Sequence, residues 1–290
     1  MNVFGFHSVN TALLCGLAVG ALAFPASAQT IAAGDSRLVG FANSVADYSP
    51  ATGVGAGLDD PLQALGAPNV GDTGAPNFLP LGLVSLGDAP VGTPAGSITL
   101  GFSNAITNGA GDDFAVFENA FLGFSDPAFV FAELAFVEVS TDGNTFARFF
   151  NTSATTIADP SNPLPTDLDV SFGRDFALLR QTNVSGFAGA DVSNTGTLFD
   201  LQALVNETAV INGDVDLNEI NFVRLIDIPG DGRSLDSNGN PIFDSFDPGA
   251  SNGGFDLDAV GVLNQVPEPG SAALLLVLAG LASRRRAAAH

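Results

Sequence analysis

The sequence lacks most of the side chains that carry nucleophilic or zinc chemistry. Its 290 residues include no tryptophan, one cysteine and two histidines. The cysteine, Cys15, and the histidines, His7 and His290, all lie near the ends of the chain. A body without them has no Cys or His nucleophile, no Ser-His-Asp triad and no zinc site of the usual kind. It also has no disulfide, so the fold must be held by its packed core, by bound ions, or by both.

Basic residues are also scarce, with 9 against 31 acidic residues and a net charge of −22. All of them are arginines, and three, Arg284, Arg285 and Arg286, are adjacent. The other six are scattered and form no basic stripe that could neutralise phosphates, so we expect no nucleic-acid partner. Because 46% of the residues are hydrophobic, the chain can bury a core and is not a disordered acidic tail.

The N-terminus has the pattern of a secretory signal peptide. An apolar run, Thr11–Phe24, is too short to span a membrane and is followed by the small residues Ala26 and Ala28. We expect export and cleavage directly after Ala28, so that residues 1–28 are removed. Cys15, inside the apolar run, is interpreted as a filler hydrophobe.

The C-terminus from residue 266 to 290 carries a second short apolar segment. Pro267-Glu268-Pro269 precedes the apolar stretch Gly270–Ser283, which Arg284-Arg285-Arg286 follows. As a helix this stretch would be about 21 Å long, short of the ~30 Å hydrocarbon core, and the prolines prevent its extension. Physics alone therefore predicts a marginal or transient anchor whose arginine end stays cytoplasmic.

This tail resembles the PEP-CTERM sorting signal of Gram-negative, exopolysaccharide-producing bacteria. Its three parts occur in the order of that signal: Pro267-Glu268-Pro269, the apolar helix, and the arginine cluster. The resemblance implies an exosortase-type partner that cleaves near Glu268, transient contact with the inner membrane, and transfer to the cell surface. A simple single-pass anchor is the alternative.

The body, residues 29–265, is predicted to be an all-β sandwich in one domain. Short apolar runs separated by Gly, Pro, Asn and Asp predict strands, and one leucine pattern predicts a short helix. The expected strands are Ser97–Phe102, Asp113–Glu118, Leu134–Thr141, Thr145–Phe150, Asn221–Ile228 and Phe255–Leu263, and the expected helix is Thr197–Asn206.

One stretch of the body resembles a known fold family. Val137–Phe146 looks like the strand–turn–strand of galactose-binding-like jelly rolls, with Asp142-Gly143-Asn144 as the turn. Gly111–Asn119 and Gly254–Val262 resemble blocks of uncharacterised bacterial surface proteins that carry the same sorting tail. The resemblance implies a jelly-roll-like sandwich without indicating a ligand.

Asp256 and Asp258 are the first candidate calcium ligands. Two residues apart on a strand, they would share one face about 6.6 Å apart, with Leu257 and Ala259 on the other. Carboxylates so placed need donors, a cation or a raised pKa, and calcium takes 6–8 oxygens. The alternative is a solvated sheet face.

The segment from Asp231 to Asp244 is the second candidate. Its oxygen side chains recur at alternate positions, as in calcium loops. Gly239 stands fourth rather than sixth and no Glu closes the loop, so an EF-hand is excluded. A non-helical calcium turn and an ordinary surface turn both stay open. The oxygen-bearing residues are Asp231, Asp236, Asn238, Asn240 and Asp244.

A third group of acids brackets the strand Asp113–Glu118. Asp112 and Glu118 could present ligands where the strand meets its loops. Such a pair could also serve a glycosidase as acid and nucleophile, but acidic pairs are expected by chance in a chain with 31 acids.

Sugar recognition is undercut by composition, because tryptophan is absent and Tyr48 is the one tyrosine. Phe78, Phe124 and Phe187 are weak candidates for exposed loop aromatics. We therefore assign no catalytic residue. The sequence favours an exported, calcium-stabilised structural or adhesive protein of the cell surface or exopolysaccharide matrix. A carbohydrate-binding module is the alternative, and a hydrolase acting through acids alone is third.

Overall fold

The computed structural model describes residues 30–68, 83–123, 126, 128–154, 177–192, 195–245 and 253–266. Within these ranges almost all regular structure is antiparallel strand, which confirms the all-β prediction. The helices there are α1 (Thr208–Ile211) and the 3-10 turns η1 (Pro61–Ala64), η3 (Gln181–Asn183) and η4 (Leu201–Leu204). None of these described helices has the length and apolar character needed to cross a membrane.

One large sheet is built around β6 and β16, which lie at its centre. Its strand order is β1-β14-β6-β16-β2, and β4 also pairs with β16. The bounds are β1 (Thr30–Ala32), β14 (Thr195–Phe199), β6 (Phe114–Glu118), β16 (Asp256–Val262), β2 (Gly40–Phe41) and β4 (Val84–Ser85).

The second large sheet is centred on β15, which pairs with β9 on one side and β5 on the other. Its strand order is β10-β9-β15-β5-β3. The bounds are β10 (Ala147–Arg148), β9 (Ala135–Ser140), β15 (Ile220–Asp227), β5 (Ser97–Ile106) and β3 (Ser44–Ser49).

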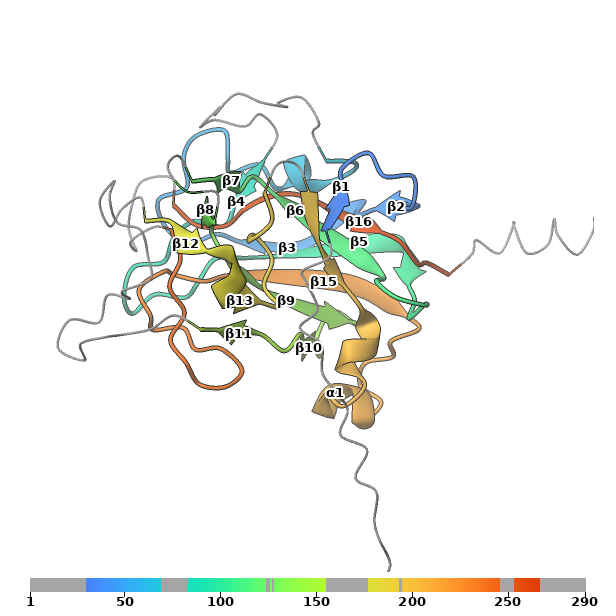
Figure 1. Ribbon diagram of the computed structural model, residues 1–290. Coiled ribbons are helices and arrows are strands. Elements are labelled where there is room, and N and C mark those ends of the chain that lie inside the picture. The colour runs from blue at the N-terminus through green and yellow to red at the C-terminus, as the bar shows by residue number, and fades with distance from the viewer. Residues whose placement is uncertain are drawn as a thin grey trace, which may run out of the picture.

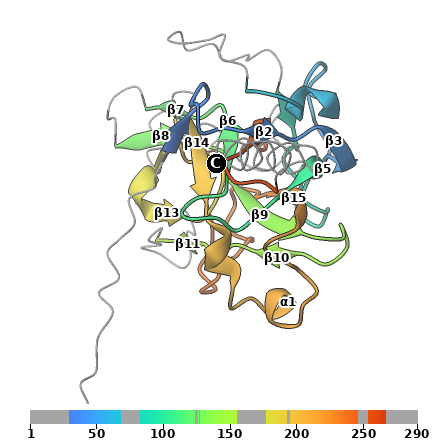
Figure 2. The same ribbon diagram turned by 90° about the vertical axis from the view of Figure 1, so that its right-hand side faces the viewer.

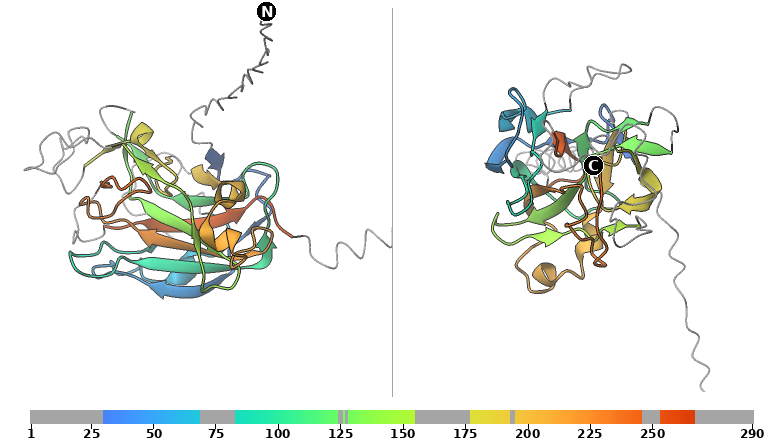
Figure 3. Two further views of the ribbon diagram at one scale, coloured as in Figure 1. Left: turned by 90° about the horizontal axis from the view of Figure 1, so that it is seen from below. Right: turned by 90° about the vertical axis from the view of Figure 1, so that its left-hand side faces the viewer.

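The two large sheets pack face to face around one apolar core (Figures 1 and 2). Val116 and Val260 enter it from the first sheet, and Leu100, Val137 and Val223 enter it from the second. All five are buried, and each such side chain contributes about 1.5–3 kcal/mol through the hydrophobic effect. This arrangement is that of a β-sandwich, seen from below and from its other end in Figure 3.

Two smaller sheets accompany the sandwich. The three-stranded sheet β12-β8-β7 carries Val130 and Leu179 into a separate apolar cluster that also holds Phe136 of β9. The two-stranded sheet pairs β11 with β13. The bounds are β7 (Phe121–Leu122), β8 (Phe129–Phe131), β12 (Leu179–Arg180), β11 (Thr152–Ser153) and β13 (Val184–Ser185).

Most predicted strands exist, and two predictions need correction. The expected helix Thr197–Asn206 is wrong in its first half, because Thr197 to Phe199 belong to β14 and the helical turn begins at Leu201. Pairing with β6 overrides the local leucine pattern. The expected return strand Thr145–Phe150 is reduced to β10, Ala147–Arg148.

Strand β9 is buried on both faces, although Glu138 and Ser140 make one of them polar. Two arginines cover that face. Arg148 Nη2 lies 2.7 Å from Glu138 Oε1, and Arg224 Nη2 lies 2.5 Å from Oε2. The guanidinium of Arg224 also lies 3.6 Å from the centroid of the Phe146 ring. Glu138 is therefore a paired structural acid.

Candidate carboxylate site

The structure buries a group of acids where strands of both large sheets end. Glu118 ends β6, Asp227 ends β15, and Asp256 begins β16. Each acts electrostatically on at least one other member of the group. We call the wider group of buried acids in this region the carboxylate cluster. Its members, none of which is more than 7% exposed, are Asp88, Glu118, Glu133, Asp227, Asp244 and Asp256.

Main-chain N–H groups at the start of β16 position two of these carboxylates. Gly254 N donates to Glu133 Oε1 at 2.6 Å, and Phe255 N donates to Asp227 Oδ1 at 2.8 Å. The backbone approaches closely here because Gly254 has φ +98°, and a Cβ on it would lie 2.4 Å from the Gly87 carbonyl carbon. Glycine at 254 is therefore required for this arrangement.

Two further members are held in the same way. Ala120 N donates to Glu118 Oε2 at 2.6 Å, and Leu134 N donates to Asp244 Oδ2 at 3.2 Å. Each of these hydrogen bonds engages one oxygen of its carboxylate. The bonds orient the groups without deciding which partner the second oxygen of each group takes.

The cluster contains buried oxygens without a hydrogen-bond partner, among them Glu118 Oε1, Asp227 Oδ2 and Asp256 Oδ1. A buried acceptor without a donor costs about 1–3 kcal/mol, and more when the group is charged. The described part of the fold thus leaves these polar atoms uncompensated in one region.

The pKa values of these groups are raised. Burial, followed by the charge of Asp256, raises the pKa of Glu118 and of Glu133 well above their usual values. Burial also raises the pKa of Asp227 well above its usual value, and the charge of Asp88 adds to this effect. For Asp256, burial raises the pKa to about 7, against a hydrogen bond with Ser85 that lowers it. All four groups resist ionisation as the structure stands.

Little positive charge reaches the cluster. Of the described arginines, Arg233 lowers the pKa of Asp227. Its Nε lies 3.5 Å from Asp231 Oδ1, and its Nη2 donates to the Ala89 carbonyl. Arg37 pairs with Asp35, Arg148 and Arg224 pair with Glu138, and Arg180 lies over the Phe129 ring.

Three predicted ligands, Glu118, Asp244 and Asp256, fall in the cluster, although the sequence analysis had placed them in three separate candidate sites. Asp88, Glu133 and Asp227 were missed. Glu133 interrupts the apolar run of residues 129–136, and Asp227 interrupts the shorter apolar run of residues 225–228. An acid inside a buried run was the available signal.

The regular alternation predicted from Asp256 to Ala259 is wrong, because Leu257 and Ala259 do not share a face. The register of β16 against β6 shifts between Leu257 and Ala259, which pair with the adjacent residues Glu118 and Phe117. Leu257 therefore packs in the core between the sheets, while Ala259 packs in a small cluster on the outer side. Such a bulge breaks the alternation on which the prediction depended, and Asp258 is partly exposed.

The loop from Asp231 to Asp244 is not one site. Asp236 Oδ1 accepts from Asn238 N at 2.9 Å and Asn240 N at 2.8 Å. Its Oδ2 accepts from Ser153 N at 2.8 Å and Asn240 Nδ2 at 3.1 Å. Burial opposes this charge, yet the hydrogen bonds hold the pKa of Asp236 below its usual value. The loop is a turn organised by Asp236, with donors already on both oxygens.

The other acids near β6 lie at the opposite end of the strand from Glu118. Asp113 is buried and accepts from Gly109 N, Leu201 N and Asn264 Nδ2 at 2.7–2.9 Å. Asp112 is half-buried, and burial, then Asp200, raises its pKa. Asp112 and Glu118 are therefore not brought together.

Among the described residues, no group of three or more His, Cys, Asp or Glu side chains is placed so that it could hold a metal ion. Side-chain movement would be needed for several cluster oxygens to reach one ion.

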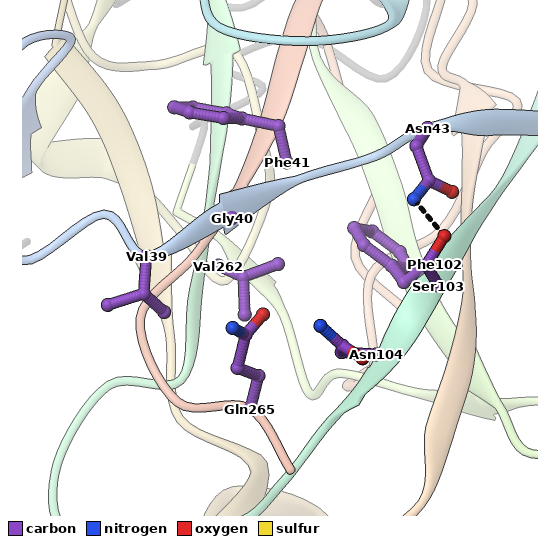
Figure 4. A pocket seen from close by; sticks show the side chains of 9 residues that line it. All are labelled: Val39, Gly40, Phe41, Asn43, Phe102, Ser103, Asn104, Val262 and Gln265. Carbon is purple, nitrogen blue, oxygen red and sulfur yellow. Dashed lines mark hydrogen bonds between the residues drawn. The ribbon is translucent and has the colours of Figure 1, made fainter. Parts of the chain in front are cut away.

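A separate cavity of about 400 Å³ lies beside β2 and the end of β5 (Figure 4). Figure 4 shows the amides of Asn43, Asn104 and Gln265 around it, while the Phe41 ring points away from them. Asn43 Nδ2 donates to Ser103 Oγ. The remaining residues that line the cavity are Val39, Gly40, Phe102 and Val262, so no charged side chain lines it.

Phe187, which was expected to be exposed, is only 2% exposed and packs in the apolar cluster beside the three-stranded sheet.

No protein-family model matches the chain, and no curated protein matches its sequence. The predicted cleavage residues Ala26 and Ala28 lie outside the described residues, as do Phe78 and Phe124. The predicted sorting residues, Pro267 to Pro269 and Arg284 to Arg286, also lie outside them.

Proposed function

We propose that the chain is an exported, acidic protein of the cell surface or exopolysaccharide matrix with a structural or adhesive role and a calcium-stabilised body. The observation that carries this proposal is that the buried acids of the body accept hydrogen bonds that tie distant segments of the fold together. Glu133, Asp227 and Asp113 each accept main-chain N–H groups from segments remote in sequence. These carboxylates connect the fold and are not displayed to a substrate.

A hydrolase that acts through acids alone is disfavoured by the same burial. A glycosidase needs two carboxyl groups that flank a bound sugar, one on each side of the scissile bond. Glu118, Glu133 and Asp256 are each more than nine-tenths buried, so a sugar chain has no access to them. The proposal therefore assigns no catalytic residue.

Export and surface transfer are proposed from the two chain ends. The signal-peptide pattern of residues 1–28 supports export, and the order Pro-Glu-Pro, apolar run, arginines supports processing by an exosortase-type enzyme at the inner membrane. The jelly-roll likeness of Val137–Phe146 supports the same class of surface protein.

Neutral residues in place of Arg284, Arg285 and Arg286 are expected to misplace the protein or release it with its tail intact. Positive charge after an apolar run keeps that end cytoplasmic, so its loss removes the stop that presents the cleavage element. Cell fractionation and the mass of the surface protein measure this. Arg37→Gln, which changes an exposed arginine of the body, is the matched control. Unchanged surface processing in the triple variant would count against the sorting proposal.

Carbohydrate binding is a second candidate, and the uncharged cavity beside β2 favours it. Carboxamides and hydroxyls donate and accept, as sugar hydroxyls do, and the cavity presents Asn43, Asn104, Gln265 and Ser103. A glycan array with the purified chain tests this candidate. Specific binding that Gln265→Ala removes supports the module, and absence of binding leaves the structural role.

A further inference from the structure

We propose that the carboxylate cluster binds one calcium ion through Glu118, Glu133, Asp227 and Asp256. This assignment rests on the proposed calcium-stabilised function and gives that function a location. It replaces both sites expected from the sequence, the Asp256/Asp258 pair and the Asp231–Asp244 loop.

Several carboxylates of the cluster have one oxygen oriented by the main chain or another oxygen without a hydrogen-bond donor. Glu118 and Asp227 each have one oxygen fixed by a main-chain N–H, at 2.6 Å and 2.8 Å, and the other oxygen buried without a donor. Asp256 likewise has a buried oxygen without a partner. Carboxylates that are oriented by the backbone and lack a second donor are suited to ligate a cation.

Electrostatic repulsion among the carboxylates of the cluster also favours a bound cation. The cluster members repel one another in a region from which water is excluded, and a buried ionised carboxylate is costly unless paired. Among the described arginines, Arg233 acts on Asp227, and it also contacts Asp231 and the Ala89 carbonyl. A bound divalent cation supplies the charge that the side chains do not.

The chemistry of the ligand atoms indicates which ion binds. All candidate ligands are carboxylate oxygens, which favour hard cations and exclude the usual thiolate and imidazole sites of zinc. The described acids are not placed so that three or more of them could already hold a metal ion, so ligation requires the side chains to move toward it. Calcium takes 6–8 oxygens in flexible geometry, whereas magnesium demands near-ideal octahedral ligands.

The position of Tyr48 makes a direct test possible. Tyr48 donates its hydroxyl to the Ser85 carbonyl at 2.7 Å, and Ser85 pairs with Asp256 across β4 and β16. It is the one tyrosine of a chain without tryptophan. Terbium(III), which takes the same oxygen ligands as calcium, emits when a neighbouring tyrosine is excited. Tyr48 is therefore a local antenna for an ion in the cluster.

The experiment titrates the purified full-length chain with terbium(III), displaces the terbium with calcium, and measures melting temperatures in calcium and in EDTA. Sensitised emission that calcium removes is expected. Tyr48→Phe should abolish the emission but keep the calcium-dependent rise in melting temperature. Glu118→Gln and Asp256→Asn should each weaken calcium binding at least tenfold.

Asp113→Asn and Asp236→Asn are matched controls, because both replace acids that already have several donors outside the cluster. Both should keep the full calcium response. Glu118→Gln and Asp256→Asn each remove one of several repelling charges, so neither should melt lower than the parent in EDTA.

The outcomes distinguish an error in the proposed ligand set from a failure of calcium stabilisation itself. If calcium still raises the melting temperature of the Glu118→Gln and Asp256→Asn variants, the ligand set is wrong while calcium stabilisation stands. Loss of the response in Asp236→Asn alone places the ion in the loop and overturns the assignment. If calcium affects no variant and not the parent, calcium stabilisation itself fails. Lower EDTA melting temperatures in both cluster variants also contradict the assignment.

Discussion

In EDTA, the melting temperature of the purified chain is expected to fall by roughly 10 °C between about pH 5 and pH 8. The pKa of Asp256 in the fold is about 7, against an ordinary value of 3.8, and those of Glu118, Glu133 and Asp227 are raised as well. A carboxyl with a raised pKa stabilises the fold below its ordinary pKa, and this contribution is lost as pH rises through the folded value. For Asp256 alone the total loss is on the order of 4 kcal/mol, of which about 3 kcal/mol falls between about pH 5 and pH 8.

The two histidines, His7 and His290, lie at the chain ends. Outside the cluster, burial also raises the pKa of Asp112 and of Asp191, so the contribution of the cluster is taken from the comparison with a cluster variant. Exposed carboxyls with ordinary pKa values are already ionised at pH 5. Melting curves by circular dichroism suit a chain without tryptophan. A variant that combines Glu118→Gln with Asp256→Asn should show a flatter pH dependence. A parent whose stability rises from pH 5 to 8 in EDTA would falsify the description of the cluster as buried and uncompensated.

Calcium is expected to raise the melting temperature at neutral pH by about 5–10 °C over EDTA. A ligand that binds only the folded state at a hundredfold excess over Kd stabilises by about 2.7 kcal/mol, and a body of this size gains roughly 2–4 °C per kcal/mol. The net charge of residues 29–266 is −24, so part of any salt effect is general screening.

Sodium chloride at matched ionic strength is the control for that screening. It should reproduce only a small part of the calcium shift, because screening acts on exposed charges and the cluster is buried. Equal shifts with calcium and sodium would show that the acids are a solvated surface without a specific site.

The strands of the sandwich could be predicted from the sequence because their apolar pattern is local. Asp113–Glu118, Asn221–Ile228 and Phe255–Leu263 were placed within a residue or two of β6, β15 and β16. Pairing between strands is not local, and the error at Thr197–Phe199 shows the consequence. Leu198 lies at helical spacing from Leu201 and Leu204, but residues 197–199 pair with β6, and Thr197 also pairs with β1.

The composition of the site could not be predicted, because it depends on which strand ends meet. Glu118, Asp227 and Asp256 are separated by more than a hundred residues from first to last and come together only through the sheets. The bulge at Asp258 is a second reason: one extra residue changed the face on which Ala259 lies, and no residue type there signals it.

The Asp231–Asp244 loop misled the sequence analysis for a different physical reason. Asp and Asn at alternate positions serve both calcium loops and turns in which a carboxylate accepts main-chain N–H groups. Asp236 is of the second kind, with donors on both oxygens. Asp244, at the end of the same loop, belongs to the carboxylate cluster, and its Oδ2 accepts a hydrogen bond from Leu134 N.

The most direct test of the central claim is a crystal structure of the chain grown in calcium, with anomalous scattering used to place the ion. The account predicts one strong peak bounded by Glu118, Glu133, Asp227 and Asp256, with the free oxygens of Glu118 and Asp227 turned onto it. A peak at Asp236 instead, or an interior whose carboxylates share protons with no ion between them, would contradict it.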